Sequence, residues 1–323
     1  MRVLLSLLLA LAAGWSQAQV PAGFSFAIVG DAPYSSWEES RFAEMLDEIN
    51  QENVAFVVHV GDIKSGSSPC SDELYQDRKR LFQASRHAFI LVPGDNDWTD
   101  CHRRAAGGHD PLERLARLRQ VFYAGDMSLG QTALRLERQS DHPGTDARFR
   151  QYRENVRWVV DGVLFIGLNV PGSNNNFGRT PQMDAEHAQR SAANAAWLEQ
   201  GFELAQGKHY AAVFIVIQAN PDFDLSYLRR VNRADGYAAF KQQLLAHTLA
   251  FGKPVVLVHG DTHRFRVDQP LFDPATLKRV EPFTRIESFG SPFVDWIKVT
   301  IDPANPKLIS AATRSPVNAR QPY

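Results

Sequence analysis

Four apolar runs in the sequence end in the same dipeptide, Gly-Asp. The runs are AIVGD, VVHVGD, ILVPGD and LVHGD, and their aspartates are Asp31, Asp62, Asp95 and Asp261. Runs this apolar are typical of parallel strands buried on both faces, and open α/β sheets bind ligands outside the carboxyl ends of their strands. One aspartate in such a place commonly caps a helix or closes a turn. Four of them predict a shared site.

A fifth Gly-Asp, at Asp126, follows LRQVFYA and does not belong to this set. The apolar spacing of that segment is typical of the end of a helix. We therefore leave Asp126 out of the predicted site.

The rest of the pattern predicts an α/β fold in which short apolar strands alternate with amphipathic helices. The predicted strands are 24–29, 54–60, 88–92, 163–168, 212–217 and 255–258. The predicted helices are 37–50, 73–85, 111–122, 185–205 and 237–250. The segment FVDWIKVTI alternates in the manner of a half-exposed antiparallel strand. Two polar stretches, 125–155 and 169–184, are long enough to be functional loops.

The first residues, MRVLLSLLLALAAGWSQAQ, have the pattern of an export signal. Arg2 supplies the positive region, residues 3–13 the apolar core, and Ser16-Gln17-Ala18 a cleavage site of small residues. The apolar core is too short to span a membrane, and no later segment approaches about 20 apolar residues. We expect residues 1–18 to be removed and 19–323 to fold as one domain in the periplasm or outside the cell.

Composition limits the classes of partner. The formal net charge is −1, with 44% hydrophobic and 22% charged residues, which is ordinary for a globular protein. No long basic block favours a nucleic acid or an anionic membrane as partner. The oligomeric state is left open.

The chain has two cysteines, Cys70 and Cys101, each a short way past a Gly-Asp turn. If the two turns are neighbours, an exported chain can link them by a disulfide worth roughly 3 kcal/mol in the chain-entropy model. Two separate buried thiols are the alternative. We favour the disulfide.

Several carboxylates at one sheet edge repel one another strongly unless they are protonated or bind cations. A bound divalent metal ion is the simplest relief. The spacing of His263, two residues after Asp261, adds a nitrogen ligand to the same turn.

From about residue 24 to 265, this series of strand ends resembles the calcineurin-like metallophosphoesterases. The family pattern is Asp-x-His, Gly-Asp, Gly-Asn-His-Asp/Glu, a lone His and Gly-His-x-His at successive strand ends. Asp31 lies at the first motif and Asp62 at the second. GDND, ending at Asp97, lies on the third, and GDTH, ending at His263, on the last. The resemblance implies a metal-dependent phosphoesterase with an αββα sandwich fold, its metal site at the carboxyl ends of the strands.

The sequence departs from the family pattern inside these motifs. Pro33, Asp95, Asn96 and Asp261 replace residues that the family uses as His or Asn. The lone His of the fourth motif is also missing, and the nearest polar residues there are Gln218 and Asn220. Each of these two can offer a carbonyl oxygen.

The implied metal ligands are therefore mostly oxygen atoms. They are Asp31, Asp62, Asp95, Gln218, Asp261 and His263. Such a set favours one or two ions of Mn, Mg or Ca over Zn. One ion would lie among Asp31, Asp62 and His263, and a second would share Asp62 with Asp95 and Asp261.

We assign Asn96, Asp97 and His263 to catalysis by the same resemblance. Asn96 stands where the family has the histidine that assists the leaving group, and an amide cannot act as that proton donor. General acid catalysis is worth about 10² to 10⁴ in rate, so good leaving groups suffer least from its loss. The sequence therefore predicts a preference for anhydrides or activated esters, which equal turnover of aryl and alkyl phosphates would contradict.

Other polar residues near the predicted site have weaker signals. Lys64, His102, Asn169 and Asn220 are candidate contacts for a small phosphorylated substrate, although solvated or loop positions are the alternative. Two further histidines, His59 and His259, are expected behind the ligands as hydrogen-bond supports. Three other features remain open: Arg103 as a phosphate contact, residues 174–176 as a substrate loop, and Trp98 as either a stacking or a buried aromatic.

Three functions compete. The leading one is hydrolysis of phosphate esters or anhydrides. The second is a protein of the same fold that binds a phosphorylated or anionic ligand without hydrolysing it, favoured by Pro33, Asn96 and Asp261. The third is a calcium site that only stabilises the domain. The gain of carboxylates where nitrogen ligands are lost favours the first.

Overall fold

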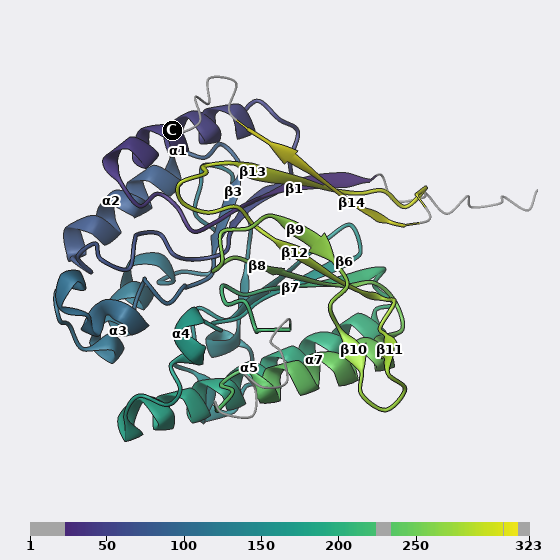
Figure 1. The fold of residues 1–323 in the computed structure, drawn as a ribbon. Coiled ribbons are helices and arrows are strands. Elements are labelled where there is room, and N and C mark those ends of the chain that lie inside the picture. Colours follow the sequence, from purple (N-terminus) through teal and green to yellow (C-terminus); the bar gives the residue numbers. More distant parts are fainter. Residues whose placement is uncertain (1–22, 224–233, 306, 316–323) are drawn as a thin grey trace, which may run out of the picture.

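The protein has four layers, two β-sheets packed face to face with helices on both outer faces (Figure 1). The computed structural model describes residues 23–223, 234–305 and 307–315. The predicted signal, residues 1–18, lies outside the described residues. The fold class predicted from the sequence is confirmed.

The first sheet has the strand order β14-β13-β1-β2-β3. Its strands are β1 (Phe24–Val29), β2 (Phe56–His59), β3 (Ala88–Leu91), β13 (Trp296–Ile301) and β14 (Ile309–Arg314). Strands β1, β2 and β3 are parallel, and β13 joins β1 in the antiparallel direction. The carboxyl ends of β1, β2 and β3 therefore meet at one edge.

The second sheet has the order β4-β5-β6-β7-β8-β12-β9. Its strands are β4 (Glu137–Arg138), β5 (Val156–Val160), β6 (Val163–Gly167), β7 (Ala212–Val216), β8 (Val255–His259), β9 (Arg266–Asp268) and β12 (Phe283–Glu287). Strands β6, β7, β8 and β12 are parallel. A small hairpin of β10 (Phe272–Asp273) and β11 (Lys278–Arg279) stands apart from both sheets.

Helices cover the outer face of each sheet. The first group is α1 (Ser36–Ile49), α2 (Asp72–Gln83) and α3 (Pro111–Phe122), and the second is α5 (Pro181–Gly207) and α7 (Ala238–Phe251). Shorter helical turns are η1 (Thr99–His102), η2 (Arg104–Ala106), η3 (Gln139–Asp141), η4 (Ala147–Phe149) and α4 (Gly172–Asn175). Within the described residues, no helix is long and apolar enough to cross a membrane.

Three apolar cores separate the layers. Alternate residues of β1 show why the strands are apolar throughout, because Phe26 and Ile28 belong to the core between the sheets, whereas Ala27 and Val29 pack under the first group of helices. A third core joins the second sheet to α5 and α7. Side chains that alternate between two buried faces leave no polar positions within the strand.

The six predicted strands and five predicted helices are confirmed, with ends that shift by a few residues. The alternating segment FVDWIKVTI forms the antiparallel β13 between β1 and β14, in which Ile297, Val299 and Ile301 are buried and the residues between them are half-buried, as the alternation predicts. Strands β5 and β12 were not predicted. Charged residues interrupt both of them, notably Arg157 in β5 and Arg285 in β12, and each of these is buried through an ion pair.

Candidate active site

The four Gly-Asp turns meet at one edge of the sandwich. Asp31 follows β1, Asp62 follows β2, Asp95 follows β3, and Asp261 follows β8 of the second sheet. The backbone N–H of Asp31 donates to the carbonyl of Gly61 at 3.0 Å, and that of Asp261 donates to the Asp31 carboxylate at 3.0 Å. These bonds link turns that are far apart in sequence and place the site across both sheets.

The glycines of the third and fourth turns leave room for a neighbouring carboxylate. A side chain on Gly94 would overlap the carboxylate of Asp62, and one on Gly260 would overlap that of Asp31. Packing this close requires a residue without a Cβ atom. At these two turns the glycine is thus a consequence of bringing the aspartates together.

Strained backbone marks the same turns. Asp31, Asp62, Asp261 and His263 have φ values of 49°, 57°, 79° and 60°. Residues other than glycine seldom adopt this left-handed conformation, and it clusters at functional sites where the surrounding structure maintains the strain.

Burial and repulsion from neighbouring carboxylates disfavour the charged form of all four aspartates. Burial, and then Asp261, raise the pKa of Asp31 well above its usual value, and burial and then Asp95 do the same for the pKa of Asp62. Burial followed by Asp261 raises the pKa of Asp95 to about 7, and burial raises the pKa of Asp261 to about 6. Positive charge from a ligand would relieve this repulsion.

Asp97 and Asn96 lie in the third turn but have different surroundings. The carboxylate of Asp97 accepts backbone N–H groups from Asp62, Ile63 and Gly94 at 2.7–3.0 Å, so it braces the second turn against the third. The Asn96 side-chain amide donates to Asp62 Oδ2 at 2.8 Å, and its backbone N–H donates to Asp62 Oδ1 at 2.9 Å. Asn96 thus holds the Asp62 carboxylate on both oxygens.

His263 is oriented as metal-binding histidines are. Its Nδ1 bonds to the carbonyl of Ser291 at 2.7 Å, which requires the proton on Nδ1 and leaves the lone pair on Nε2. Nε2 lies 3.7 Å from Asp31 Oδ1 and 3.4 Å from the hydroxyl of Tyr34. That hydroxyl also donates to Asp62 Oδ2 at 3.2 Å and accepts from the Asn96 amide. The Tyr34 hydroxyl therefore lies among the second, third and fourth turns.

The structure differs from expectation at Gln218 and Asn220. The Gln218 carbonyl accepts the N–H of Gly172 at 2.5 Å, so its amide nitrogen faces Asp95 and Asp261 at 3.5 Å. The Asn220 carbonyl accepts the N–H of Asp222, and its backbone N–H donates to Asp261. As the side chains lie, neither residue offers a carbonyl oxygen to the cluster.

Four other predicted residues lie behind the site. His59 is buried between the carbonyl of Ala32 and the N–H of Gly61, and burial lowers its pKa to about 4. His259 is also buried with its pKa lowered to about 3, and its Nδ1 donates to Gly260. Lys64 is buried with its ammonium on the carbonyls of Ser65 and Ser68.

Asn169 is equally buried. Its amide donates to Glu154, while its Oδ1 has no hydrogen-bond partner among the described residues. Neither Lys64 nor Asn169 lines the cavity beside the cluster.

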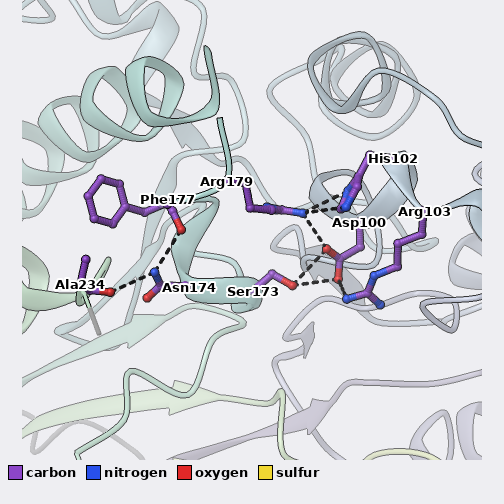
Figure 2. A pocket seen from close by; sticks show the side chains of 9 residues that line it. Asp100, His102, Arg103, Ser173, Asn174, Phe177, Arg179 and Ala234 are labelled. Carbon is purple, nitrogen blue, oxygen red and sulfur yellow. Dashed lines mark hydrogen bonds and ion pairs between the residues drawn. The ribbon is translucent and has the colours of Figure 1, made fainter. Parts of the chain in front are cut away.

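That cavity lies beside the third turn and is lined by polar and charged residues (Figure 2). His102 is on its wall with Arg103, Arg179 and Asp100. The opposite wall is a turn formed by α4 and the residue that follows it. Residues 173–176 of this turn all have positive φ values. The Ser173 hydroxyl lies 2.7 Å from Asp95 Oδ2, so the cavity adjoins the cluster.

The predicted disulfide is present between Cys70 and Cys101, whose Cα atoms are 5.8 Å apart. It joins the loop after β2 to the loop after β3. Trp98 is buried, with the guanidinium of Arg190 5.3 Å from its ring, so it packs in the interior instead of stacking on a ligand.

The carboxylates and His263 are suitable donors for a divalent cation, but their donor atoms do not converge on a single position. Among residues 23–223, 234–305 and 307–315, no three His, Cys, Asp or Glu side chains are already arranged to hold a metal ion. The carboxylates instead accept hydrogen bonds from one another's turns. The mutual repulsion and the free lone pair of His263 fit a cation, provided that the aspartate side chains rotate.

Comparison with known proteins decides the family. The family model described as calcineurin-like phosphoesterase matches residues 24–265. This chain belongs to that family. The resemblance inferred from the Gly-Asp turns is confirmed, and members of the family are phosphoesterases that use divalent metal ions.

Solved structures share the fold at low identity. The structure of PhoD has a TM-score of 0.56 and 12% identity, covering 92% of this chain and 69% of its own. A dimetal phosphatase from Danio rerio has a TM-score of 0.50 and 12% identity, covering 91% of this chain and 99% of its own. No curated protein matches this sequence. At these identities the neighbours establish the fold alone.

Four residues of the site were missed by the sequence analysis, namely Tyr34, Asp100, Ser173 and Arg179. Tyr34 follows Asp31 by three residues, a spacing that carried no motif. Ser173 lies in the polar stretch 169–184, next to the asparagines 174–176 that the sequence marks as a candidate substrate loop.

Proposed function

We propose that this protein hydrolyses phosphate esters or anhydrides of small molecules with water, at a carboxylate cluster that binds one or two divalent metal ions. The observation that carries the proposal is the meeting of Asp31, Asp62, Asp95 and Asp261 in one buried cluster, with the free Nε2 of His263 beside it. The family membership supports the reaction class.

Each residue has a part in this proposal. Asp31, Asp62 and His263 would hold one ion, and Asp62, Asp95 and Asp261 a second. Divalent ions at such a site polarise phosphate oxygens and make water a better nucleophile. The oxygen-rich set favours Mn, Mg or Ca over Zn. Gln218 would join as a ligand only if its amide turned over.

The remaining residues position these ligands. Asn96 fixes the two oxygens of Asp62 and has no proton to give to a leaving group. Asp97 keeps the second and third turns in register through its three backbone N–H bonds. Of the predicted substrate contacts, His102 is the one on the cavity wall.

The test combines metal content with hydrolysis. The protein, purified without chelator, is analysed for bound metal and assayed on mono- and bis-p-nitrophenyl phosphate with Mn, Mg, Ca or Zn added. We expect turnover that depends on metal and falls by at least about 10³ in Asp62→Asn, since the variant loses a shared ligand charge. Asp126→Asn is the matched control, because Asp126 is the aspartate of the one Gly-Asp outside the cluster and pairs with Arg135. Its activity should equal that of the wild type.

A second candidate is a binding protein without hydrolysis. The amide N–H groups of Asn96 and Asp261, which already occupy the carboxylates of Asp62 and Asp31, and the absence of a closed ligand group in the described chain favour it. Bound metal with no turnover of either activated ester would support this function. A chelator that lowers the melting temperature of a protein with no turnover and no affinity for phosphate would support a purely structural ion.

A further inference from the structure

The cavity beside the cluster has a volume of about 490 Å³ and a cationic wall. Figure 2 shows the Asp100 carboxylate surrounded by Ser173, Arg103 and Arg179. Arg103 lies 2.6 Å and Arg179 3.2 Å from this carboxylate, and His102 contacts Arg179 at 3.0 Å. The wall is built from η1 on one side and from the segment after α4 on the other.

The charges of this wall do not balance. Asp100 is 1% exposed and neutralises one positive charge, yet two guanidinium groups reach it. The side chains of Arg103 and Arg179 remain 48% and 25% exposed. Arg179 also donates to the carbonyl of Thr99 and to Asn176 Oδ1, whereas the guanidinium of Arg103 pairs only with Asp100 among the described residues, so the N–H groups left for the cavity belong mainly to Arg103. Arginine presents several donors in a planar fork that matches phosphate and carboxylate oxygens. The wall can therefore bind an anion in addition to Asp100.

The opposite wall is held in a costly shape. Ser173, Asn174, Asn175 and Asn176 have φ values of 49° to 63°, a left-handed conformation that residues other than glycine adopt singly and not in succession. Arg190, which is fully buried, fastens the turn by bonds to the backbone carbonyl and side-chain oxygen of Asn175. A shape maintained at this cost is a mark of function.

The turn connects the cavity to the reacting centre. The Ser173 hydroxyl lies 2.7 Å from Asp95 in the cluster and 2.8 Å from Asp100 in the cavity wall. One hydroxyl group thus separates the two sites. On the other side of the cavity, Gly66 lies between Arg103 and Asn96. A Cβ atom on Gly66 would lie 2.6 Å from Arg103 Nη1 and 2.8 Å from Asn96 Oδ1. Arg103 is therefore adjacent to Asn96.

We propose that this cavity receives a leaving group that carries its own negative charge, so that the substrates are phosphoanhydrides or compounds with a second phosphate next to the one attacked. The inference rests on the proposed function and gives its substrate class. Asn96 supplies no proton, and a departing phosphate needs none because the arginines stabilise its charge.

The reaction balances without a general acid. The oxygen of water forms a bond to the attacked phosphorus, and the bond from that phosphorus to the bridging oxygen breaks. The electron pair of the broken bond leaves with the bridging oxygen on the second phosphate. The two protons of water end on the two phosphate products or in solvent.

The first arm of the test compares two substrates. Inorganic pyrophosphate has an anionic leaving group, whereas p-nitrophenyl phosphate has an activated leaving group without a second phosphate. We expect the ratio of their kcat/KM values to fall by about tenfold or more in Arg179→Met and in Arg103→Met, the loss of one charged hydrogen bond. Arg179→Lys should recover part of it.

Arg104→Met is the matched control, because Arg104 is an exposed neighbour that does not line the cavity. Its ratio should stay at the wild-type value. If Arg103 and Arg179 serve only to neutralise Asp100, their variants lose thermal stability while the substrate ratio stays unchanged. That result overturns the proposal and leaves the proposed function standing.

The second arm measures binding without hydrolysis. Calorimetry at one fixed Mn concentration gives the affinities for methylenediphosphonate and methylphosphonate. The wild type should prefer the diphosphonate, and Arg179→Met should lose about tenfold of that preference, whereas Arg104→Met keeps it. Metal contributes equally in each protein, so the difference reports the cavity. If the protein hydrolyses no substrate but Arg179→Met loses the preference for the diphosphonate, only the proposed function is refuted. If wild type, Arg179→Met and Arg104→Met show the same preference, the cavity proposal is overturned.

Discussion

At the residue scale, Tyr34 contacts more of the predicted site residues than any other side chain outside the family motifs. Its hydroxyl contacts Asp62, Asn96 and His263, three residues from three different turns. We expect Tyr34→Phe to lower kcat roughly 10- to 100-fold, because groups that orient ligands have effects of this size. The fold should persist, since the ring still packs. An unchanged kcat with a lowered melting temperature would make Tyr34 a purely structural residue.

The raised pKa values of the cluster give a pH dependence to the metal-free protein. Asp95 titrates at about 7 and Asp261 at about 6 in the folded chain, whereas an unfolded Asp titrates near pH 3.9. Between these values the folded state binds more protons than the unfolded state, so the free energy of unfolding falls as pH rises. For Asp95 and Asp261 the loss begins near pH 4 and is complete above about pH 7, and the raised pKa values of Asp31 and Asp62 act in the same direction.

We therefore expect the melting temperature of the chelator-treated protein to be lower at pH 8 than at pH 5, and the drop to shrink in Asp95→Asn. Added Mn should reverse the trend, because metal binds the deprotonated carboxylates. Asp126→Asn should retain the full drop. A melting temperature that rises with pH equally in wild type and Asp95→Asn would contradict this account.

The sequence predicted that the four aspartates meet, because each follows an apolar run whose end is easy to recognise, and their role as metal ligands stays a prediction. It could not predict what each carboxylate would contact. Asp97 was assigned to catalysis with its neighbours, and nothing in the sequence indicated that its carboxylate would accept three backbone N–H groups. Gln218 was assigned as an oxygen ligand, and the N–H of Gly172, which lies 46 residues away in the chain, decides its orientation. Such contacts depend on tertiary structure.

At the scale of elements, strands buried on both faces were predictable and strands that carry buried ion pairs were not. Strand β12 contains Arg285 and Glu287, both fully buried. Arg285 pairs with Asp268 of β9, and Glu287 with Arg266 of the same strand. The charges neutralise one another only after β9 and β12 have joined, so neither segment has a strand pattern alone.

The left-handed turn at residues 173–176 was also outside the reach of sequence patterns. The run of asparagines is ordinary loop material, and asparagine tolerates positive φ one residue at a time. Four such residues in succession depend on Arg190 from α5 and on the hydroxyl of Tyr237, which accepts the Asn175 N–H at 3.1 Å. Two distant elements thus impose the shape.

At the scale of the whole molecule, the predicted export signal and the disulfide depend on each other. Both sulfur atoms are buried where the loops after β2 and β3 meet, and these loops carry Asp62 and Asp95. A disulfide forms in an oxidising compartment, so export of the chain would be needed to complete this part of the site. A chain made in the cytosol would keep two thiols there.

We expect a full-length chain expressed in bacteria to be recovered outside the cytosol, cleaved near Gln19 and without free thiols, as intact mass and thiol titration would show. The Cys70→Ala/Cys101→Ala variant should melt about 5–10 °C lower, since a disulfide closing a loop of this length is worth roughly 3–4 kcal/mol. A version that starts at Gln19 and is kept in the cytosol should have the same melting temperature as that variant until its thiols are oxidised. Full-length protein that stays uncleaved in the cytosol, with the same melting temperature as the alanine variant, would contradict both the export and the stabilising role of the disulfide.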